Sequence, residues 1–367
     1  MFLSKLPKRN RSLRPMLAAL ESRELLSVTM AHHVEKPQVA AHVLDVQHHD
    51  VQEAKKQHAP SITLLNKAKH GGFEFVNVNG PFAGTNAGAG TNFNGISNNG
   101  NSVGFDIENN GDFSNFVANP LKSRKASVLN LGSTTANAFG VNSSGVVVGT
   151  DGNGNAFYLL KGKLNTFIPN GGTSAVAFGI NDHGTIVGQY VTSAGTTPGF
   201  VRLNGNSFIT INAPSGPDTV NVQSINNHGL IVGFYVGTDG QDHGFMANEN
   251  SAVNGVITAT PIADPVIPTV PGEPGATFVF SQILSVNDKG IAVGYYGDST
   301  TSQHGFFYNT NTGVYTFLDD PQAAFNNGVE VTQITGITNS SEITGFYSDA
   351  NGVFHGFAAT VSKQGHK

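Results

Sequence analysis

Residues 71–367 alternate between short runs of β-branched and aromatic residues and turns rich in Gly, Asn and Asp. In one clear example, the polar turn 226–229 is followed by the apolar run 230–236, a second polar turn, and a run that begins at His243. β-Branched and aromatic enrichment between such turns favours strands over helices. The pattern predicts units of four short antiparallel strands, which we call strands a to d in chain order.

The same sequence motif recurs six times: a small residue, an aliphatic residue, a polar turn, a short strand-forming run, and Gly. This last glycine lies in strand b of each unit, at Gly104, Gly149, Gly188, Gly233, Gly294 and Gly345. Glycine weakens a strand unless another backbone approaches closely, so the six indicate crowding between blades or near an axis. The turns of the type Asn226–Gly229 need a positive φ, which Asn and Gly tolerate.

Four strands in every 40–50 residues or so are typical of a propeller blade. The sequence therefore predicts an all-β, six-bladed β-propeller of four-stranded antiparallel blades, with an open β-repeat array or a different blade number as the alternative. The last unit ends with the strand 354–361 and lacks strand d, while the segment 75–81 matches strand d at 208–214 in residue type. We expect this N-terminal strand to close the ring, because it would cover the unpaired edge of the last strand c.

Composition changes sharply at residue 70. None of the 45 glycines lies before residue 71, and residues 31–70 hold seven of the 13 histidines. These features predict an export or sorting segment at 1–30, a His-rich flexible linker at 31–70, the propeller at 71–361 and a tail at 362–367. Metal binding by the paired histidines of the linker is the alternative interpretation.

Charge and cysteine content exclude several classes of function. Residues 71–367 carry 19 acidic and 9 basic groups, a balance that repels phosphate backbones, so we expect no nucleic-acid partner. The chain has no Cys and therefore no disulfide or thiolate site. No run of about 18 apolar residues occurs, so the sequence predicts no transmembrane segment.

The first 30 residues combine a basic stretch, 5–14, with the short apolar segment 16–20. Two motifs in this region resemble the LEPR-XLL segment of bacterial exported and cell-surface proteins: Arg14-Pro15-Met16-Leu17 and Leu20-Glu21-Ser22-Arg23-Glu24-Leu25-Leu26-Ser27. The second motif has Ser22 where that family usually has Pro. The resemblance implies a bacterial protein located outside the cell or on its surface. A short amphipathic helix of the folded protein is the alternative.

The repeat carries a second resemblance. The run from Asn226 to Tyr235, followed by His243-Gly244-Phe245, resembles the HAF family of bacterial repeat proteins. The match covers residues 95–358 in six copies and is weakest in the first, second and sixth. It implies an extracellular location and a repeat fold, and it assigns no activity to a residue.

Three residue sets suggest chemistry, and each has a structural alternative. Tyrosines two residues after the strand-b glycine could form a glycan-binding rim or pack between blades: Tyr190, Tyr235, Tyr296 and Tyr347. Histidines that precede strand c could bind a metal, although separate blades would not bring them to one ion: His243, His304 and His355. We favour packing for the tyrosines and capping of backbone groups in turns for the histidines. Asp151–Asn155 is read as an Asx turn rather than a calcium loop.

The interval between the fourth and fifth units is lengthened by a proline-rich connection that contains Pro265, Pro268 and Pro271. Long loops often carry function, so these prolines are candidate ligand-binding residues, with a tolerated insertion as the alternative. We identify no catalytic residue, resident metal or cofactor from the sequence. The predicted function is a secreted or cell-surface binding or structural module, monomeric, whose partner is an extracellular glycan or surface protein. An exported propeller hydrolase or lyase acting on polysaccharide is the alternative.

Overall fold

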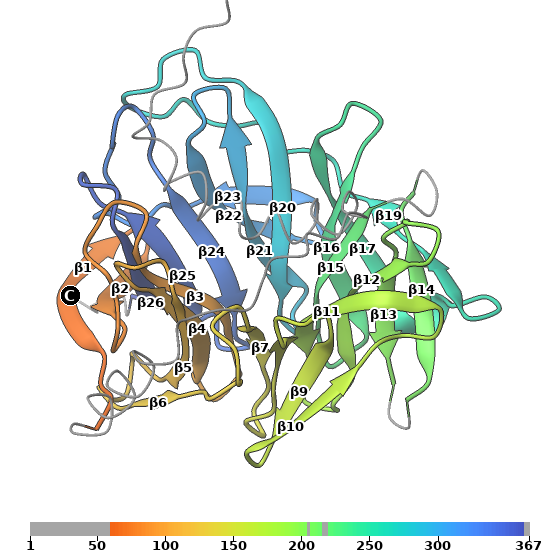
Figure 1. Cartoon of the computed structure of the whole chain (residues 1–367). Coiled ribbons are helices and arrows are strands. Elements are labelled where there is room, and N and C mark those ends of the chain that lie inside the picture. The colour runs from red at the N-terminus through yellow and green to blue at the C-terminus, as the bar shows by residue number, and fades with distance from the viewer. Residues whose placement is uncertain (1–58, 204–205, 215–218, 363–367) are drawn as a thin grey trace, which may run out of the picture.

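The computed structural model describes residues 59–203, 206–214 and 219–362 (Figure 1). The predicted export segment, residues 31–58 of the predicted linker and residues 363–367 of the tail lie outside this range. Within it, the strands form six antiparallel sets of four that surround a common axis. The predicted all-β propeller is confirmed, and we number its sets blades 1 to 6.

The innermost strand of each blade is strand a, and the other three follow outward. Blade 1 contains β3 (Gly90–Ile96), β4 (Ser102–Ile107), β5 (Phe113–Ala118) and β6 (Ala126–Val128). Blade 2 contains β7 (Asn137–Val141), β8 (Val147–Thr150), β9 (Ala156–Leu160) and β10 (Lys163–Phe167). Blade 3 contains β11 (Gly172–Ile180), β12 (Ile186–Thr192), β13 (Gly199–Arg202) and β14 (Phe208–Asn212), with β18 (Val256–Thr258) added in parallel at its outer edge.

Blade 4 contains β15 (Val220–Ile225), β16 (Leu230–Val236), β17 (Asp242–Asn248) and β19 (Thr260–Pro261), with a 3-10 turn, η2 (Glu249–Ser251), after β17. Blade 5 contains β20 (Phe278–Val286), β21 (Ile291–Asp298), β22 (Gln303–Asn309) and β23 (Val314–Phe317). Blade 6 contains β24 (Thr332–Ile337), β25 (Ile343–Ser348), β26 (Phe354–Val361) and β2 (Phe73–Asn79).

The ring is closed by the N-terminal strand, as predicted. β2 pairs antiparallel with β26 from Phe73 opposite Val361 to Val78 opposite Gly356. The ring of Phe75 lies 5.4 Å from that of Phe357, and both side chains are buried. Blade 6 in turn packs on β3 of blade 1. The first and last parts of the described chain therefore share one blade.

One expectation about the linker was wrong at its C-terminal end. Residues 63–70 form a further strand, β1 (Thr63–His70), which pairs with β2 on the outside of blade 6. Gly71 and Gly72 connect the two strands with φ angles of 55° and 82°. Two positive φ angles in a two-residue connection match the twist of an antiparallel hairpin, so the glycines allow β1 to fold back on β2.

The strand-b glycines are crowded, but by their own blade. In every blade the pairing of strands a and b contains a β-bulge near the end of strand a, just before a Gly or Ser such as Gly179 or Ser224. At this bulge the backbone of strand a lies over the strand-b glycine. A Cβ at Gly188 would overlap the carbonyl oxygen of Val176, and one at Gly294 would overlap that of Gln282. Any other residue would therefore displace strand a from strand b.

The core lies mainly between neighbouring blades. The largest buried cluster combines Val187, Val201 and Ile211 of blade 3 with Val220 and Val222 of blade 4. Each blade therefore buries its apolar faces against the next blade around the ring, as expected for repeated units that cannot bury a hydrophobic face alone.

Candidate functional site

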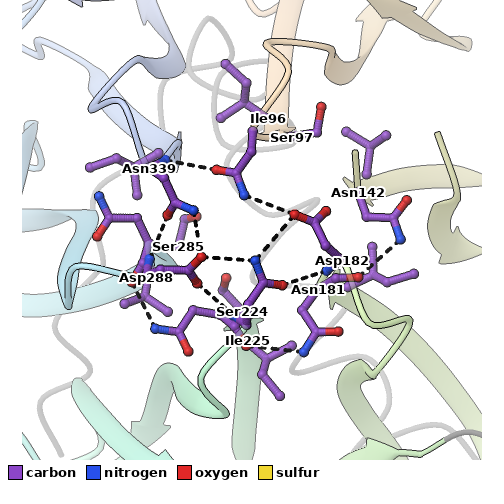
Figure 2. Close-up of a pocket in the computed structure, with 18 residues that line it drawn as sticks. Ile96, Ser97, Asn142, Asn181, Asp182, Ser224, Ile225, Ser285, Asp288 and Asn339 are labelled. Carbon is purple, nitrogen blue, oxygen red and sulfur yellow. Dashed lines mark hydrogen bonds between the residues drawn. The ribbon is translucent and has the colours of Figure 1, made fainter. Parts of the chain in front are cut away.

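The turns between strands a and b meet at one end of the axis, where they enclose a space of about 60 Å³ (Figure 2). One position of each turn contributes to a ring: Asn98, Ser143, Asp182, Asn227, Asp288 and Asn339. Five hydrogen bonds of 2.8–2.9 Å connect these positions in chain order, and in each the backbone N–H of one residue donates to the side chain of the next. The series begins with Ser143, which donates to Asp182, and ends with Asn339, which donates to Asn98. This end of the axis is therefore held closed by hydrogen bonds between blades.

The asparagine that precedes the ring position has a role that the sequence analysis missed. Asn181 Oδ1 accepts hydrogen bonds from two N–H groups of its own turn, while its Nδ2 donates to the Asn226 carbonyl in the next blade at 3.2 Å. Asn142, Asn226 and Asn287 repeat this arrangement. None of these asparagines has a positive φ, which belongs to a turn residue such as Gly184, or Ser341 in the sixth copy. The expected positive φ is therefore supplied by the glycine of the turn, and the asparagine side chain connects two blades.

Two carboxylates lie in this ring. Burial alone would raise the pKa of Asp182, but hydrogen bonds from the Ser143 N–H and from the amides of Asn98 and Asn227 hold it below its usual value. The pKa of Asp288 is lowered in the same way. Both carboxylates are thus stabilised as anions by protein N–H groups, and the ring is best understood as a structural closure.

The tyrosines selected from the sequence lie at equivalent positions of blades 3 to 6. Tyr190, Tyr296 and Tyr347 are buried, and Tyr235 is partly buried. Tyr235, Tyr296 and Tyr347 each place the ring against the histidine at the second position of strand c, with centroids 5.1–5.8 Å apart. These contacts lie within one blade. The same three rings also lie in apolar clusters that include residues of the preceding blade, which is the packing between blades that the sequence favoured. Tyr190 has no such histidine and lines a hollow described below.

The histidines selected from the sequence do not cap backbone groups, so that expectation was wrong. The rings of His243 and His355 each lie between two polar side chains, one at or shortly after the end of strand d and one from the turn between strands b and c. His243 lies between Asp264 and Asp239, and His355 between Asn79 and Asp349. The path of strand d brings these partners to the imidazole from far along the chain, which is why local turn chemistry did not predict them.

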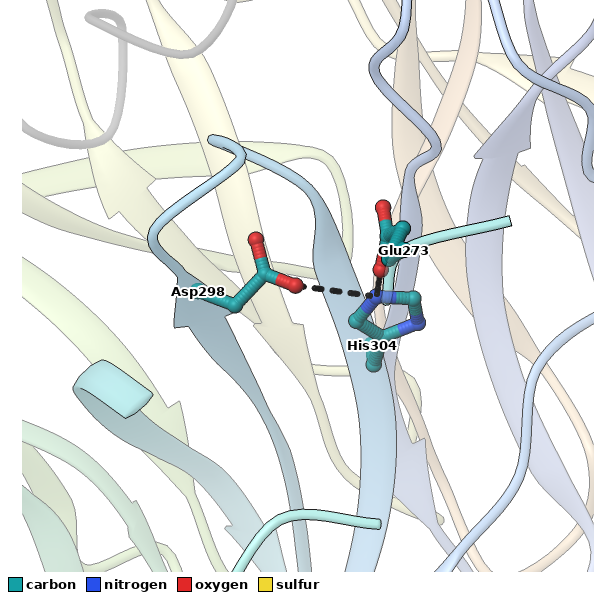
Figure 3. Close-up of side chains that lie close together, drawn as sticks. All are labelled: Glu273, Asp298 and His304. Atoms are coloured by element: carbon teal, nitrogen blue, oxygen red, sulfur yellow. Dashed lines mark hydrogen bonds and ion pairs between the residues drawn. The ribbon is translucent and has the colours of Figure 1, made fainter. Parts of the chain in front are cut away.

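His304 in blade 5 has the most buried surroundings of the three (Figure 3). Its Nδ1 lies 2.9 Å from Asp319 Oδ2, and its Nε2 lies 3.1 Å from Glu273 Oε2 and 3.8 Å from Asp298 Oδ2. Burial opposes a charge on the imidazole, but the contact with Asp319 and the nearby acidic groups raise the pKa of His304 to about 9. The pKa of Glu330, which is close enough to influence His304, is raised to about 7 by burial and by Asp319.

The long connection before blade 5 supplies Glu273, which the sequence did not single out. Pro265 in this connection is buried, whereas Pro268 and Pro271 are exposed. Ligand binding by the three prolines stays a prediction. A signal for Glu273 was present in the sequence, since it is an isolated acidic residue between Pro271 and Pro274, but only the path of the loop places its carboxylate beside His304.

The Asx turn at residues 151–155 is confirmed. Asp151 Oδ1 accepts hydrogen bonds from the N–H groups of Asn153 and Asn155 at 2.8 and 3.0 Å, and Oδ2 accepts one from Asn155 Nδ2. Both carboxylate oxygens thus interact with donors of the turn itself.

A hollow of about 440 Å³ lies at blade 3, beside the connection from blade 2. Phe208 is partly exposed and provides aromatic surface, and the buried rings of Tyr190 and Phe200 also border the hollow. Thr210 contributes a hydroxyl group that lies 3.3 Å from the Tyr190 hydroxyl. Other residues that line it are Pro169, Asn170, Asn206, Ser207 and Ile209. Ligand sites typically combine aromatic walls with a few polar groups in this way.

Among the residues that the structure describes, no helix is long and apolar enough to cross a membrane.

Comparisons with known proteins found similar structures but no matching family model or curated relative. The β-propeller domain of the Trilobed protease from Pyrococcus furiosus is 8% identical, with a TM-score of 0.43 over 84% of this chain and 96% of that one. The BP39L lectin from Burkholderia pseudomallei is 12% identical, with a TM-score of 0.40 over 83% and 96%. The fucose-binding six-bladed lectin of Aleuria aurantia is 13% identical, with a TM-score of 0.37 over 71% and 95%. Similarity at this level does not identify a ligand or a reaction for this chain.

Proposed function

We propose that the protein is a binding module that holds a neutral saccharide unit in the hollow of blade 3. The observation that carries the proposal is the joint lining of this hollow by aromatic rings and by hydroxyl and amide groups. A sugar presents apolar C–H faces and hydroxyl groups, and the two kinds of surface complement them. Tyr190, one of the residues selected from the sequence, lies at the hollow, where its hydroxyl can exchange the Thr210 contact for a ligand hydroxyl.

The aromatic side of the hollow is well supported from behind. Phe208 is partly exposed and lies with its ring centroid 6.1 Å from that of Phe200 and 6.0 Å from that of Phe167. Arg202 covers the ring of Phe167 from another side, at 5.0 Å from the centroid. Rings fixed in this way lose little side-chain freedom when a ligand stacks on them, which favours binding.

The test is glycan-array screening of the full chain, followed by calorimetry with the best neutral oligosaccharide. We expect Phe208→Ala and Tyr190→Phe each to weaken binding by about tenfold, as loss of one good contact of about 1.4 kcal/mol would. Tyr347→Phe is the matched control, because it removes the same hydroxyl at the equivalent position of blade 6. The proposal fails if no saccharide binds, or if the control weakens binding as much as Tyr190→Phe does.

We further propose that the protein acts outside the cell or on its surface. The support comes from the resemblance of residues 14–27 to the LEPR-XLL segment and of residues 95–358 to HAF repeats. Fractionation of the cells that make the protein tests this. Recovery in the medium or on the surface is expected, and recovery in the cytoplasm alone would contradict the proposal.

A further inference from the structure

We infer that Glu273, Asp298 and His304 form a binding site for a divalent metal ion in blade 5, and that Zn²⁺ fits it best (Figure 3). One donor atom of each side chain lies within 4.8 Å of the others. The shortest of the separations described above is 3.1 Å, between Glu273 Oε2 and His304 Nε2. Zinc–ligand bonds of about 2.0–2.2 Å in tetrahedral geometry place donors roughly 3.4 Å apart, so small side-chain movements suffice.

The second atom of each side chain is already occupied, which leaves one atom of each directed to the shared space. Asp298 Oδ1 accepts hydrogen bonds from the N–H groups of Thr300 and Ser302 and from the Thr300 hydroxyl. Glu273 Oε1 lies 3.1 Å from the same hydroxyl, which has one hydrogen and so can donate to only one of the two carboxylates at a time. Asp298 Oδ2 is buried and accepts no hydrogen bond, and the ionisable partner that the structure gives it is His304 Nε2 at 3.8 Å, whose proton a metal ion would replace. A buried carboxylate oxygen without a hydrogen bond is costly unless a cation completes its surroundings.

The imidazole is also oriented as a metal ligand would be. Asp319 Oδ2 contacts Nδ1 at 2.9 Å, and the opposite nitrogen, Nε2, is the one directed at Glu273 and Asp298. A carboxylate behind the non-ligating nitrogen is the usual support of a metal-bound histidine, because it fixes the orientation of the ring. The ring is held from its face as well, by Tyr296 at a centroid distance of 5.1 Å.

The balance of charge favours a cation in this place. The Glu273 and Asp298 side chains are 2% and 1% exposed, and Asp319 adds a third carboxylate at 27%. Within the described ranges, the ion pairs of these carboxylates involve His304 and no lysine or arginine. A mixed set of imidazole and carboxylate donors suits Zn²⁺ better than Ca²⁺ or Mg²⁺, which prefer oxygen donors alone.

The experiment measures the thermal unfolding of the full chain after chelator treatment, with and without ZnCl₂. Thermal stability is the readout because the N-terminal histidines are expected to bind zinc without affecting the propeller. We expect zinc to raise the Tm by several degrees, since a ligand that binds only the folded state stabilises it. Parallel additions of CaCl₂ and MgCl₂ should have a much smaller effect.

Variants connect the effect to the site. Glu273→Gln and Asp298→Asn keep the side-chain shapes and should each abolish the zinc-dependent rise in Tm. Asp319→Asn, which alters the carboxylate behind His304 Nδ1, should weaken zinc binding by about 10–100-fold. Asp239→Asn is the matched control, because it alters the acidic partner of the equivalent histidine in blade 4 and should leave the rise unchanged. The inference is overturned if zinc does not shift the Tm of the unaltered chain, or if Glu273→Gln and Asp298→Asn respond to zinc as the control does.

Discussion

Blades 4 and 5 place the same His-Gly-Phe sequence at the same register and give it different surroundings. His243 and His304 both lie opposite a tyrosine of strand b, and Nδ1 of both contacts an aspartate that follows strand d. The His243 side chain is 18% exposed, with Asp239 largely in solvent, whereas the His304 side chain is 1% exposed. The two histidines differ in exposure because the proline-rich connection places Glu273 against His304 in blade 5 and not against His243 in blade 4. The repeat thus determines the histidine and one partner, and a segment outside the repeat determines how strongly the cluster is buried.

Blade 6 extends the comparison, because His355 takes its outer partner, Asn79, from the end of the N-terminal strand β2. Val78 in β2 is buried, and its cross-strand neighbour Leu64 in β1 is 39% exposed. We expect Val78→Asp to lower the free energy of unfolding by on the order of 5 kcal/mol, because it places an unpaired charge in the core. Leu64→Asp should change it by about 0.5 kcal/mol or less. Urea denaturation measures both, and equal midpoints would show that β2 is not an integral strand of blade 6.

The comparison of blades 4 and 5 predicts unequal effects of the same substitution. In chelator-treated protein, His304→Ala leaves buried carboxylates without their cation and should cost about 3 kcal/mol or more. His243→Ala removes a more exposed interaction and should cost about 1 kcal/mol at most. Urea denaturation of the two variants at pH 7 measures the difference. Similar costs would mean that the burial of the blade 5 cluster is not energetically important.

The smallest expected effect is the titration of His243. Hydrogen bonds to Asp239 and Asp264 outweigh the effect of burial and raise the pKa of His243 above its ordinary value of 6.5. A raised pKa means that the folded state binds the proton more tightly, so the stabilisation is complete below pH 6.5 and is lost as pH rises through the folded-state pKa. NMR titration of the ring should show a lower pKa in Asp239→Asn than in the unaltered chain. An unchanged pKa would argue against the contact.

Much of the architecture follows from local pattern. Strand c of the last unit was expected at 354–361 and is β26 (Phe354–Val361), and the spare strand expected at 75–81 is β2 (Phe73–Asn79). Both follow from side-chain alternation and turn residues, which act over a few positions. By contrast, β1 was assigned to the linker, because its residues lack the glycine-rich composition of the repeat. It folds because the Gly71–Gly72 turn offers it the free edge of β2.

The candidate sites were less predictable from the sequence. Tyr190 was selected with Tyr235, Tyr296 and Tyr347 because all four share one repeat position, yet Tyr190 alone among them lines the hollow of blade 3. The other three rings are covered by the histidine of strand c, whereas blade 3 has Pro198 before its Gly199-Phe200.

By itself, the sequence determined the strand pattern, the six repeats, the closing strand and the positions of the recurring histidines, since these follow from local residue patterns and from the count of strands in each repeat. Only the tertiary structure decided which groups surround those histidines and how deeply they are buried. Glu273 meets His304 across 31 residues, and Asn79 meets His355 across 276. Contacts of this kind depend on the path of a loop and on where single side chains lie once the ring has closed, and a repeating strand pattern does not specify either.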